Sequence, residues 1–449
     1  MRNRVGTKGD RNAKVSDVKR ELGRELGIGM LGCGVVGSQV ARLLTEDSGD
    51  FAARSGARLN LKRIAVRDLA TKRENISSEL LTQDSESVVD DKSIDIVIEV
   101  MGGIEPARTL ILRAIQNGKS IITANKALLA KHGAELFEAA DKKGVDLYYE
   151  AAVGGAIPIL RPLRESIVGD HVHRIMGIVN GTTNYILTKM DEEGSDFAVA
   201  LKEAQQLGFA EADPTADIEG HDAAAKAAIL AGLAFHTRVT SDQVSAEGIT
   251  KISARDVAVA HDINHVIKLL AIAELTDKGE VSVRVQPTLL PRQHPLAAVR
   301  NAFNAIFVEA ESAGELMFYG RGAGGAPTAS AILGDLIAIA RNMTSGGTGQ
   351  GESDYAELKF ADPGSVKTRY LIRLDVNDRP GVLAAVAQIF ATNKVSIETV
   401  RQSGRGNSAE LIVMTHSADE GSLHKTVSDL AKSDVVKSVE SVLRVEGMR

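Results

Sequence analysis

Short apolar runs alternate with amphipathic stretches along the first third of the chain. Stretches with helical periodicity, such as Arg108–Asn117 and Leu128–Lys142, separate the runs. This alternation is typical of βαβ units in a parallel sheet, and strands that are apolar almost throughout indicate that helices cover both faces. The polar insert at 46–58 is expected to be a surface excursion. The predicted strands are Leu26–Leu31, Leu59–Val66, Ile94–Val100, Ser120–Thr123 and Val145–Glu150.

The pattern changes after Pro158. Val172–Val179 and Glu280–Leu289 are predicted strands of a different layer, whereas Phe197–Leu207 and Asp222–Phe235 have the pattern of helices. Residues 156–325 are therefore predicted to form a second, α+β domain for substrate binding and dimerisation. A further helix at 326–343 is expected to pack back onto the first domain, residues 25–155.

The C-terminal part of the chain begins with a Gly-rich stretch, Gly346–Gly351. With the polar residues that follow, it predicts a flexible linker at 344–366 that places few contacts across the boundary. Residues 367–449 alternate strand, helix, strand, strand, helix and strand, which predicts a small βαββαβ module. Residues 1–24 are basic and polar without an apolar face, and are expected to be a disordered tail.

Composition narrows the class of protein. A chain of 449 residues is too long for one hydrophobic core, and 44% hydrophobic with 25% charged residues is ordinary for a soluble globular protein. The net charge of -6 gives no reason to expect nucleic acid or a membrane as partner, and the apolar runs end before membrane-spanning length. With one cysteine, Cys33, no intrachain disulfide is possible, and a cytoplasmic location is expected.

Three glycines follow the first predicted strand. Gly32, Gly34 and Gly37 form a G-x-G-x-x-G motif, and a predicted helix, Val35–Leu44, begins within it. In this context Gly32 allows a tight turn, Gly34 lets the backbone approach a pyrophosphate, and Gly37 lets helix and strand pack closely. The helix N-terminus attracts the phosphates. A Rossmann-type doubly wound parallel sheet that binds a dinucleotide is therefore favoured over a plain Gly-rich turn.

The second strand ends with two residues that favour different dinucleotides. Asp68 could hold the ribose 2′-hydroxyl of NAD, and Arg67 could accommodate the 2′-phosphate of NADP. Because Arg67 comes first, NADP or use of both cofactors is favoured. An arginine that only solvates the strand end is nearly as good an interpretation.

Asp222 and Lys226 lie four residues apart, and so on one face of the predicted helix. Residues 227–235 are wholly apolar or Gly, which indicates a helix buried all round rather than a surface ion pair. A lysine in such a helix must be paired or functional, and a nearby carboxylate can tune it for proton transfer. Lys126 is a second candidate, because it follows the strand that ends at Thr123 and ligands bind at the carboxyl ends of parallel strands. A solvated lysine at a helix start fits Lys126 equally well.

At this point the residues resemble the homoserine dehydrogenase family. The glycine loop, Thr123–Lys126, Glu150–Ile157 and Gly320–Pro327 resemble family segments in the expected order. The resemblance runs from about Leu26 to the end of the chain. It implies reversible NAD(P)H-dependent interconversion of L-aspartate 4-semialdehyde and L-homoserine in threonine, methionine and isoleucine biosynthesis. The family signature lies in Ala204–Lys226 and is matched at Gly208, Asp213, Pro214, Asp217, Gly220, Asp222 and Lys226.

The resemblance also implies roles for single residues. Lys226 is the expected proton donor to the aldehyde oxygen, with Asp222 beside the substrate and Lys126 between nicotinamide and substrate. The implied substrate-binding residues are Glu211, Asp217, Asp222 and Gly208, with Glu211 and Asp217 on the amino group. The implied cofactor-binding residues are Gly32, Gly34, Val35, Val36, Gly37, Arg67, Thr123, Lys126 and Gly324. A sodium or potassium site, largely of backbone carbonyls, is implied at Glu150, Val153, Gly155 and Ile157.

The segment 377–383, N-D-R-P-G-V-L, follows a predicted strand and opens a helix. Together with the βαββαβ pattern it resembles an ACT domain. This resemblance implies an amino-acid effector, with threonine expected, and a homodimer or homotetramer. A purely structural dimerisation domain remains an alternative. The implied effector-binding residues are Asn377, Asp378, Gly381, Val382 and Leu383.

Two other functions stay open at this stage. One is another semialdehyde or amino-acid dehydrogenase that uses a lysine as acid. The other is a non-catalytic, nucleotide-dependent amino-acid sensor with the last module as receiver. The presence of Lys126, Asp222 and Lys226 together argues against a sensor.

Overall fold

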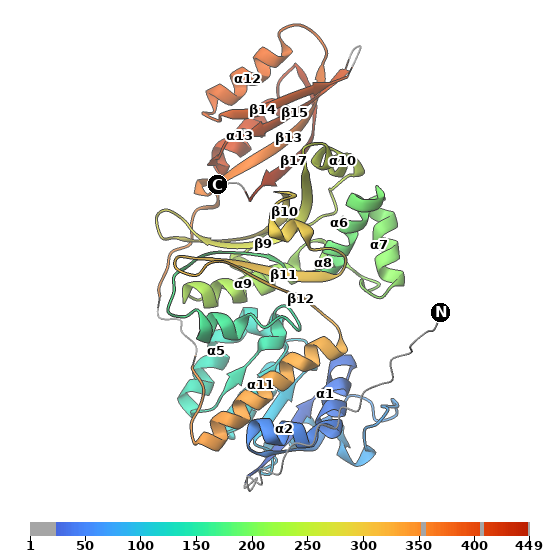
Figure 1. Ribbon diagram of the computed structural model, residues 1–449, viewed down its shortest axis with the longest axis vertical. Helices are drawn as coiled ribbons and strands as arrows, with labels where there is room; N and C mark the ends of the chain where they lie inside the picture. The colour runs from blue at the N-terminus through green and yellow to red at the C-terminus, as the bar shows by residue number, and fades with distance from the viewer. Residues whose placement is uncertain (1–23, 352–355, 405–407, 448–449) are drawn as a thin grey trace, which may run out of the picture.

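The computed structural model describes residues 24–351, 356–404 and 408–447. The predicted tail, apart from its last residue, lies outside the described residues. The molecule is elongated, with a domain of sheet and helices at one end, a second sheet in the middle and the C-terminal module at the other end (Figure 1). No helix within the described ranges is long and apolar enough to cross a membrane.

The N-terminal domain is built on six parallel strands in the order β3-β2-β1-β4-β5-β6. This is the doubly wound order, in which the winding reverses beside β1 and leaves a crevice at the carboxyl ends of the strands. All five predicted strands are present, and the short edge strand β3 was not indicated by the apolar pattern. The strands are β1 (Glu25–Leu31), β2 (Arg58–Ala65), β3 (Leu81–Thr82), β4 (Ile96–Glu99), β5 (Ser120–Thr123) and β6 (Leu147–Tyr148).

Helices cover both faces of this sheet, and each face has its own apolar core. The predicted helix at 326–343 is α11 (Gly325–Ser345), which packs against α1 and α2. The expectation of a surface excursion at 46–58 is wrong, because α2 buries Phe51 and Ala52. The other helices are α1 (Val35–Glu46), α2 (Ser48–Ser55), α3 (Ser85–Asp90), α4 (Ala107–Gln116) and α5 (Lys126–Lys143).

The middle of the molecule is a mixed layer of strands and helices. Helix α9 lies between the strands β9 and β10 on one side and α5 on the other. It is therefore buried almost all round, as its apolar sequence predicted. The strands are β7 (Val172–Ile178), β8 (Ser245–Ala246), β9 (His265–Leu275), β10 (Val281–Pro291), β11 (Phe303–Ala310) and β12 (Gly314–Arg321). The helices are α6 (Gly181–Glu193), α7 (Phe197–Gln206), α8 (Thr215–Ile218), α9 (His221–Phe235) and α10 (Ala254–Asp262).

The C-terminal module has the predicted βαββαβ order, but its sheet is continuous with that of the middle layer. Strand β17 pairs in parallel with β10 through Thr288–Arg444 and Leu289–Val445, and antiparallel with β13. The result is one sheet of eleven strands. The elements are β13 (Lys367–Asn377), α12 (Val382–Thr392), β14 (Ile397–Ser403), β15 (Ser408–Thr415), β16 (Ala418–Asp419), α13 (Glu420–Ala431) and β17 (Val436–Val445).

The described part of the predicted linker at 344–366 is anchored to the domains on either side. Gly349 donates its N–H to Asp146 Oδ1 at 2.7 Å. Farther along, the Val281 N–H donates to the Lys359 carbonyl at 2.8 Å. The expectation of few contacts across this boundary is therefore wrong, since both the linker and β17 bond to the rest of the chain.

Candidate active site

The glycine loop leaves open space where a ligand could approach. A Cβ on Gly32, whose φ is +100°, would lie 2.7 Å from the Val100 carbonyl oxygen, and one on Gly37 would lie 2.7 Å from that of Gly32. These two glycines are therefore required by the protein itself. A Cβ on Gly34 would meet nothing within 4 Å. The loop thus offers bare backbone at the start of α1, which has no side-chain cap.

A second helix begins at the same place. Gly324 precedes α11 with a φ of +123°, and again no side chain caps the helix. A Cβ on Gly325 would lie 2.9 Å from Val35 Cγ1, so the start of α11 closes on the start of α1. Val35 itself is 77% exposed, and Val36 is half-buried beside it. Two uncapped helix N-termini therefore converge at the glycine loop, an arrangement that favours a pyrophosphate.

The end of the second strand carries more positive charge than the sequence indicated. Arg67 is exposed there. Asp68 accepts hydrogen bonds from the Thr71 hydroxyl and the Ala70 N–H, both at 2.8 Å, and these lower the pKa of its carboxyl. Arg73 donates from Nε to the Cys33 carbonyl oxygen at 3.2 Å, within the glycine loop. Two arginines thus lie at this corner, while Asp68 is engaged by its own turn.

The carboxyl ends of β4 and β5 are tied together by Glu99. This buried carboxylate accepts from the Thr123 hydroxyl at 2.6 Å and from the Met101 N–H at 2.9 Å. Asn125 then caps α5 by accepting from the Leu128 N–H at 3.2 Å. This geometry fixes the first residue of α5, Lys126, at the edge of the crevice.

Asp222 joins the two lysines singled out in the sequence. Its Oδ1 lies 2.9 Å from Lys126 Nζ, and its Oδ2 lies 2.7 Å from Lys226 Nζ. Lys226 also donates to the Val179 carbonyl oxygen at 2.7 Å and is 8% exposed, whereas the Lys126 side chain is 40% exposed. An ammonium has three protons, so these two bonds leave Lys226 one for a substrate.

The three charges shift one another's protonation. Burial alone would raise the pKa of the Asp222 carboxyl, but the positive charges of Lys226 and Lys126 hold it well below its usual range. Burial lowers the pKa of Lys126, but the Asp222 carboxylate, with help from Asp217 and Glu211, raises it overall. The cluster therefore carries a fixed negative charge between two cations at neutral pH.

Asn180 is a site residue that sequence reasoning missed. Its amide nitrogen donates to Asp217 Oδ1 at 2.7 Å and to Asp222 Oδ2 at 2.9 Å, while its oxygen caps α6 at the Thr183 N–H. Burial, helped by Asp222, raises the pKa of Asp217, and the bond from Asn180 opposes this rise. The signal in the sequence was an N-cap asparagine directly after a predicted strand. That signal does not reveal its partners.

The remaining predicted substrate residues lie on the rim of the same site. Glu211 is exposed, and its charge is near enough to affect the pKa of Lys126. Gly208 has a φ of +75° directly after α7, and its N–H donates to the Gln205 carbonyl. Gly208 thus ends a helix, whereas Glu211 and Asp217 place carboxylates toward the lysines.

The Glu150 carboxylate acts as a helix cap. It accepts from the backbone N–H groups of Ile159, Leu160 and Arg161 at 2.6, 2.8 and 2.9 Å. Between them, Gly154 and Gly155 have φ of +75° and +57°, which turns the carbonyl-bearing backbone of residues 153–157 sharply. The described residues contain no cluster of three His, Cys, Asp or Glu side chains suited to a metal. A cation here would therefore rely on main-chain oxygens.

Asp335, on α11, supports this segment and is fully buried. It accepts from the Glu150 N–H at 2.9 Å and pairs with Arg161 at 2.5 Å. Burial, helped by the nearby Glu150 carboxylate, raises the pKa of Asp335 to about 7, against the opposing charge of Arg161. The pattern of α11 did not single this residue out.

Comparison with known proteins decides the family. Residues 158–337 match the family model for homoserine dehydrogenase, residues 32–150 match that for the homoserine dehydrogenase NAD-binding domain, and residues 370–434 match that for the ACT domain. The homoserine dehydrogenase of Corynebacterium glutamicum is 55% identical over 428 residues, which cover 94% of this chain and 96% of the relative.

The chain belongs to the homoserine dehydrogenase family.

Solved structures of homoserine dehydrogenases show the same fold. That of Thiobacillus denitrificans superposes with a TM-score of 0.90 at 38% identity, over 94% of this chain and 99% of the other. A hyperthermophilic archaeal homoserine dehydrogenase solved in complex with NADPH superposes with a TM-score of 0.60 at 29% identity, over 70% of this chain and 97% of the other. The chain is thus an oxidoreductase of this family with an NAD(P)-binding domain and an ACT domain.

The predicted effector residues lie together in the ACT domain, between β13 and α12. Asn377 donates from its amide to the Asp434 carbonyl oxygen at 3.2 Å, and Asp378 accepts from Gln402 at 3.4 Å. Gly381 has a φ of +90°, and a Cβ there would meet nothing within 4 Å. Val382 is buried, whereas Leu383 is 46% exposed. The loop is therefore open at Gly381 and Leu383.

Proposed function

We propose that the chain catalyses the reversible NAD(P)H-dependent reduction of L-aspartate 4-semialdehyde to L-homoserine, a step toward threonine, methionine and isoleucine. One observation carries this proposal: Asp222 bridges Lys126 and Lys226 beside the crevice of a dinucleotide-binding sheet. Residues 25–155 would hold the dinucleotide, residues 156–325 the substrate, and residues 367–449 an effector.

The chain's own part in the reaction is proton transfer and orientation. When bound, the nicotinamide supplies the hydride to the aldehyde carbon or takes it from the alcohol. Lys226 donates a proton to the carbonyl oxygen as the alcohol forms and accepts it in reverse. Asp222 holds the Lys226 ammonium in place, and Lys126 adds a second positive charge near the developing oxyanion.

Substrate recognition would rest on carboxylates. The substrate carries an ammonium group, and Glu211 and Asp217 offer negative charge on the side of the cluster away from the α1 loop. Asn180 fixes Asp217 and Asp222 relative to each other, because its single amide donates to both. This arrangement selects an amino-acid aldehyde over an aldehyde without the ammonium.

NADP is the preferred cofactor in this proposal, with NAD as a second. The glycine loop, Val35, Val36 and Gly324 would surround the pyrophosphate, and Thr123 and Lys126 would lie toward the nicotinamide. Arg67 and Arg73 offer positive charge for a 2′-phosphate, while the Asp68 carboxylate is occupied by Thr71 and Ala70. A ribose without the phosphate would have no comparable charged partner.

A monovalent cation, sodium or potassium, is proposed at Val153, Gly155 and Ile157. Hard cations prefer oxygen ligands, and the tight turn at residues 153–157 presents backbone carbonyls. Glu150 would contribute charge from the adjoining cap rather than a free carboxylate, because three N–H groups already bind its side chain.

Threonine is the proposed effector, and a homodimer or homotetramer is the proposed assembly. Strand β14 is an edge of the eleven-stranded sheet and is exposed over most of its length. Val400 on this strand is 40% exposed and Leu383 is 46% exposed. Such an edge suits pairing with a second copy, which would place two effector loops near one another.

Absorbance of NADPH with aspartate 4-semialdehyde as substrate tests the proposal. We expect consumption of NADPH that depends on the aldehyde, and formation of NADPH from homoserine with NADP. Succinic semialdehyde, which lacks the ammonium, is the matched control and should react poorly. Binding of NADPH without turnover of any aldehyde would support a sensor instead. Equal rates with both aldehydes would point to another semialdehyde dehydrogenase.

A further inference from the structure

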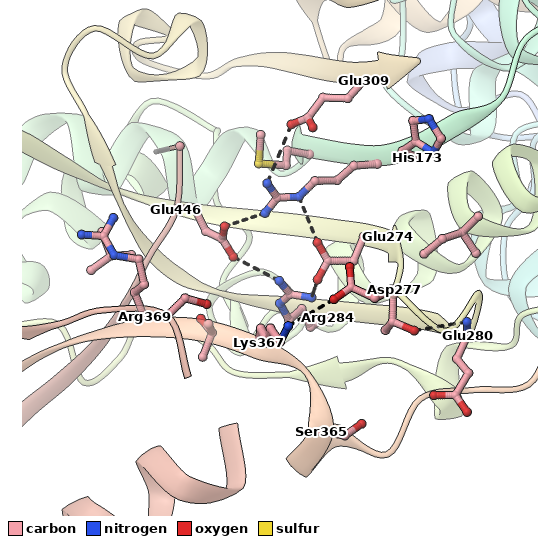
Figure 2. A pocket seen from close by; sticks show the side chains of 18 of the residues that line it. His173, Glu274, Asp277, Glu280, Arg284, Glu309, Ser365, Lys367, Arg369 and Glu446 are labelled. Atoms are coloured by element: carbon pink, nitrogen blue, oxygen red, sulfur yellow. Dashed lines mark hydrogen bonds and ion pairs between the residues drawn. The ribbon is translucent and has the colours of Figure 1, made fainter. Parts of the chain in front are cut away.

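Four buried charges form a closed ring where the C-terminal module meets the middle layer. Glu446, directly after β17, accepts from Arg174 at 2.5 Å and from Arg284 at 3.0 Å. Glu274 closes the ring, at 3.1 Å from Arg174 and 2.6 Å from Arg284. Figure 2 shows Glu446 and Glu274 on either side of the Arg284 guanidinium. The exposed fractions of the four side chains are only 5–14%.

The ring depends on the module for one of its carboxylates. Arg174, Arg284 and Glu274 belong to β7, β10 and β9, whereas Glu446 comes from the module. Without Glu446, two buried guanidinium groups would share Glu274 and the more distant Glu309, which is 3.7 Å from Arg174. Removing one partner of a buried ion pair leaves an uncompensated charge and is strongly unfavourable. The position of Arg174 is therefore sensitive to the presence of Glu446.

The module is tied to the middle layer locally here rather than by continuous packing. A cavity of about 1140 Å³ lies beside the ring. It is lined from the middle layer by residues such as Glu274 and Lys278, and from the module by Lys367 and Arg369. The ring and the short pairing of β10 with β17 therefore bridge a region that side chains do not fill.

Arg174 lies on the strand that leads directly to the catalytic cluster. Residues 174–178 of β7 are buried without interruption, and the chain continues into Val179 and Asn180. The Val179 carbonyl holds Lys226, and the Asn180 amide holds Asp217 and Asp222. A buried strand transmits a shift along its length, because packed interiors are stiff.

We propose that Glu446 is a positioning residue for the reaction: by closing the ring on Arg174 it fixes β7, and through Val179 and Asn180 it fixes the Lys226 ammonium and the Asp222 carboxylate. This rests on the proposed function of that cluster. The C-terminal module thus contributes to turnover in the absence of any effector.

The test compares Glu446→Gln with Glu410→Gln in the full-length chain. Glu410, on β15 of the module, pairs with Arg255 on α10 of the middle layer, so its substitution also breaks an ion pair across the boundary but touches neither the ring nor β7. We expect Glu446→Gln to lower kcat about 10-fold, since small misplacements of catalytic groups are costly. NADPH affinity should stay unchanged, because the glycine loop lies in the other domain. Glu410→Gln should keep the wild-type kcat.

Two further measurements keep the outcomes separate. Glu446→Asp keeps the charge with a shorter reach, so it should restore part of the lost kcat, and it carries the test if Glu446→Gln does not fold. An equal loss of kcat in Glu446→Gln and Glu410→Gln would overturn the proposal, as would a wild-type kcat in a folded Glu446→Gln. A wild-type enzyme without turnover would instead refute the proposed function.

Discussion

Asp222 meets one lysine from its own helix and one from another domain. The pair with Lys226 could be predicted, because the two residues are four apart in an apolar helix. The contact with Lys126 could not, because it depends on how α5 docks against α9. Asn180 was missed for the same reason: its N-cap position is local, but its two carboxylate partners are distant in sequence.

Arg67 tests cofactor preference at the level of one side chain. Arg67→Ala should raise the KM for NADPH by about 10-fold, the lower end of the range for a charged hydrogen bond, because Arg67 is exposed. The KM for NADH should hardly change. Arg73→Ala is the companion variant and should act in the same direction if both arginines face the 2′-phosphate. Equal effects of Arg67→Ala on both cofactors would remove this role.

Lys268 predicts a pH dependence of stability. It is 2% exposed in β9 and donates to the Val299 carbonyl at 2.6 Å and to Asn184 at 3.0 Å. Burial lowers the pKa of Lys268 to about 8, and the nearby carboxylates of Asp191 and Glu192 oppose this only in part. The folded protein therefore releases this proton at a lower pH than the unfolded chain does.

The sign follows from linkage. Between pH 8 and the ordinary lysine pKa of about 10.4, the unfolded chain binds more protons, so the free energy of unfolding rises with pH. Relative to Lys268→Met, the wild type should gain about 1 kcal/mol between pH 7 and pH 9. Urea unfolding at both pH values measures the difference. Parallel pH dependences in the two proteins would contradict the lowered pKa.

Elements were predictable where the apolar pattern had one interpretation. The strands of the first sheet are short apolar runs between helices, and all five were found. Strand β9 was missed because an apolar run of this length suits a buried helix as well as a strand. Strand β12 was missed because its residues are exposed or half-buried throughout, which leaves little apolar signal.

Helix α11 should depend on Asp335 for its attachment. Asp335→Asn removes the charge that pairs with Arg161 and weakens the bond to the Glu150 N–H. Breaking a buried pair costs about 3–5 kcal/mol, and the half-buried Arg161 places this case at or below the lower end. Urea unfolding at pH 8, where the carboxyl is ionised, measures the loss. The double variant with Arg161→Met should lose less than the sum of the single variants, and strict additivity would show that the pair is not coupled.

At the scale of the whole molecule, the order of the domains could be predicted but their junction could not. The Gly-rich stretch at 346–351 suggested a loose tether. The pairing of β17 with β10 was invisible, because parallel strands far apart in sequence leave no local pattern. Ring residues such as Arg174 and Glu446 likewise look like ordinary strand charges in the sequence.

Ending the chain after Gly351 tests how the module contributes. The truncated chain should show a lower thermal midpoint and a reduced kcat, because β10 loses a neighbour and two buried arginines lose Glu446. Inhibition by threonine should disappear with the module. A truncated chain with the full-length midpoint and kcat would restore the view of an independent module. Inhibition that persists would place the effector site elsewhere.

The central claim is that Lys226 supplies the proton for reduction of the aldehyde, and its most direct test is the kcat of Lys226→Met. This change keeps the length of the side chain and its apolar stem but removes the ammonium. Loss of general acid catalysis lowers the rate by about 10²–10⁴-fold, and the loss should fall on kcat while NADPH affinity, measured by fluorescence titration, stays at the wild-type value. A folded Lys226→Met that binds NADPH normally and keeps a near-normal kcat would show that the lysine is structural and contradict the account.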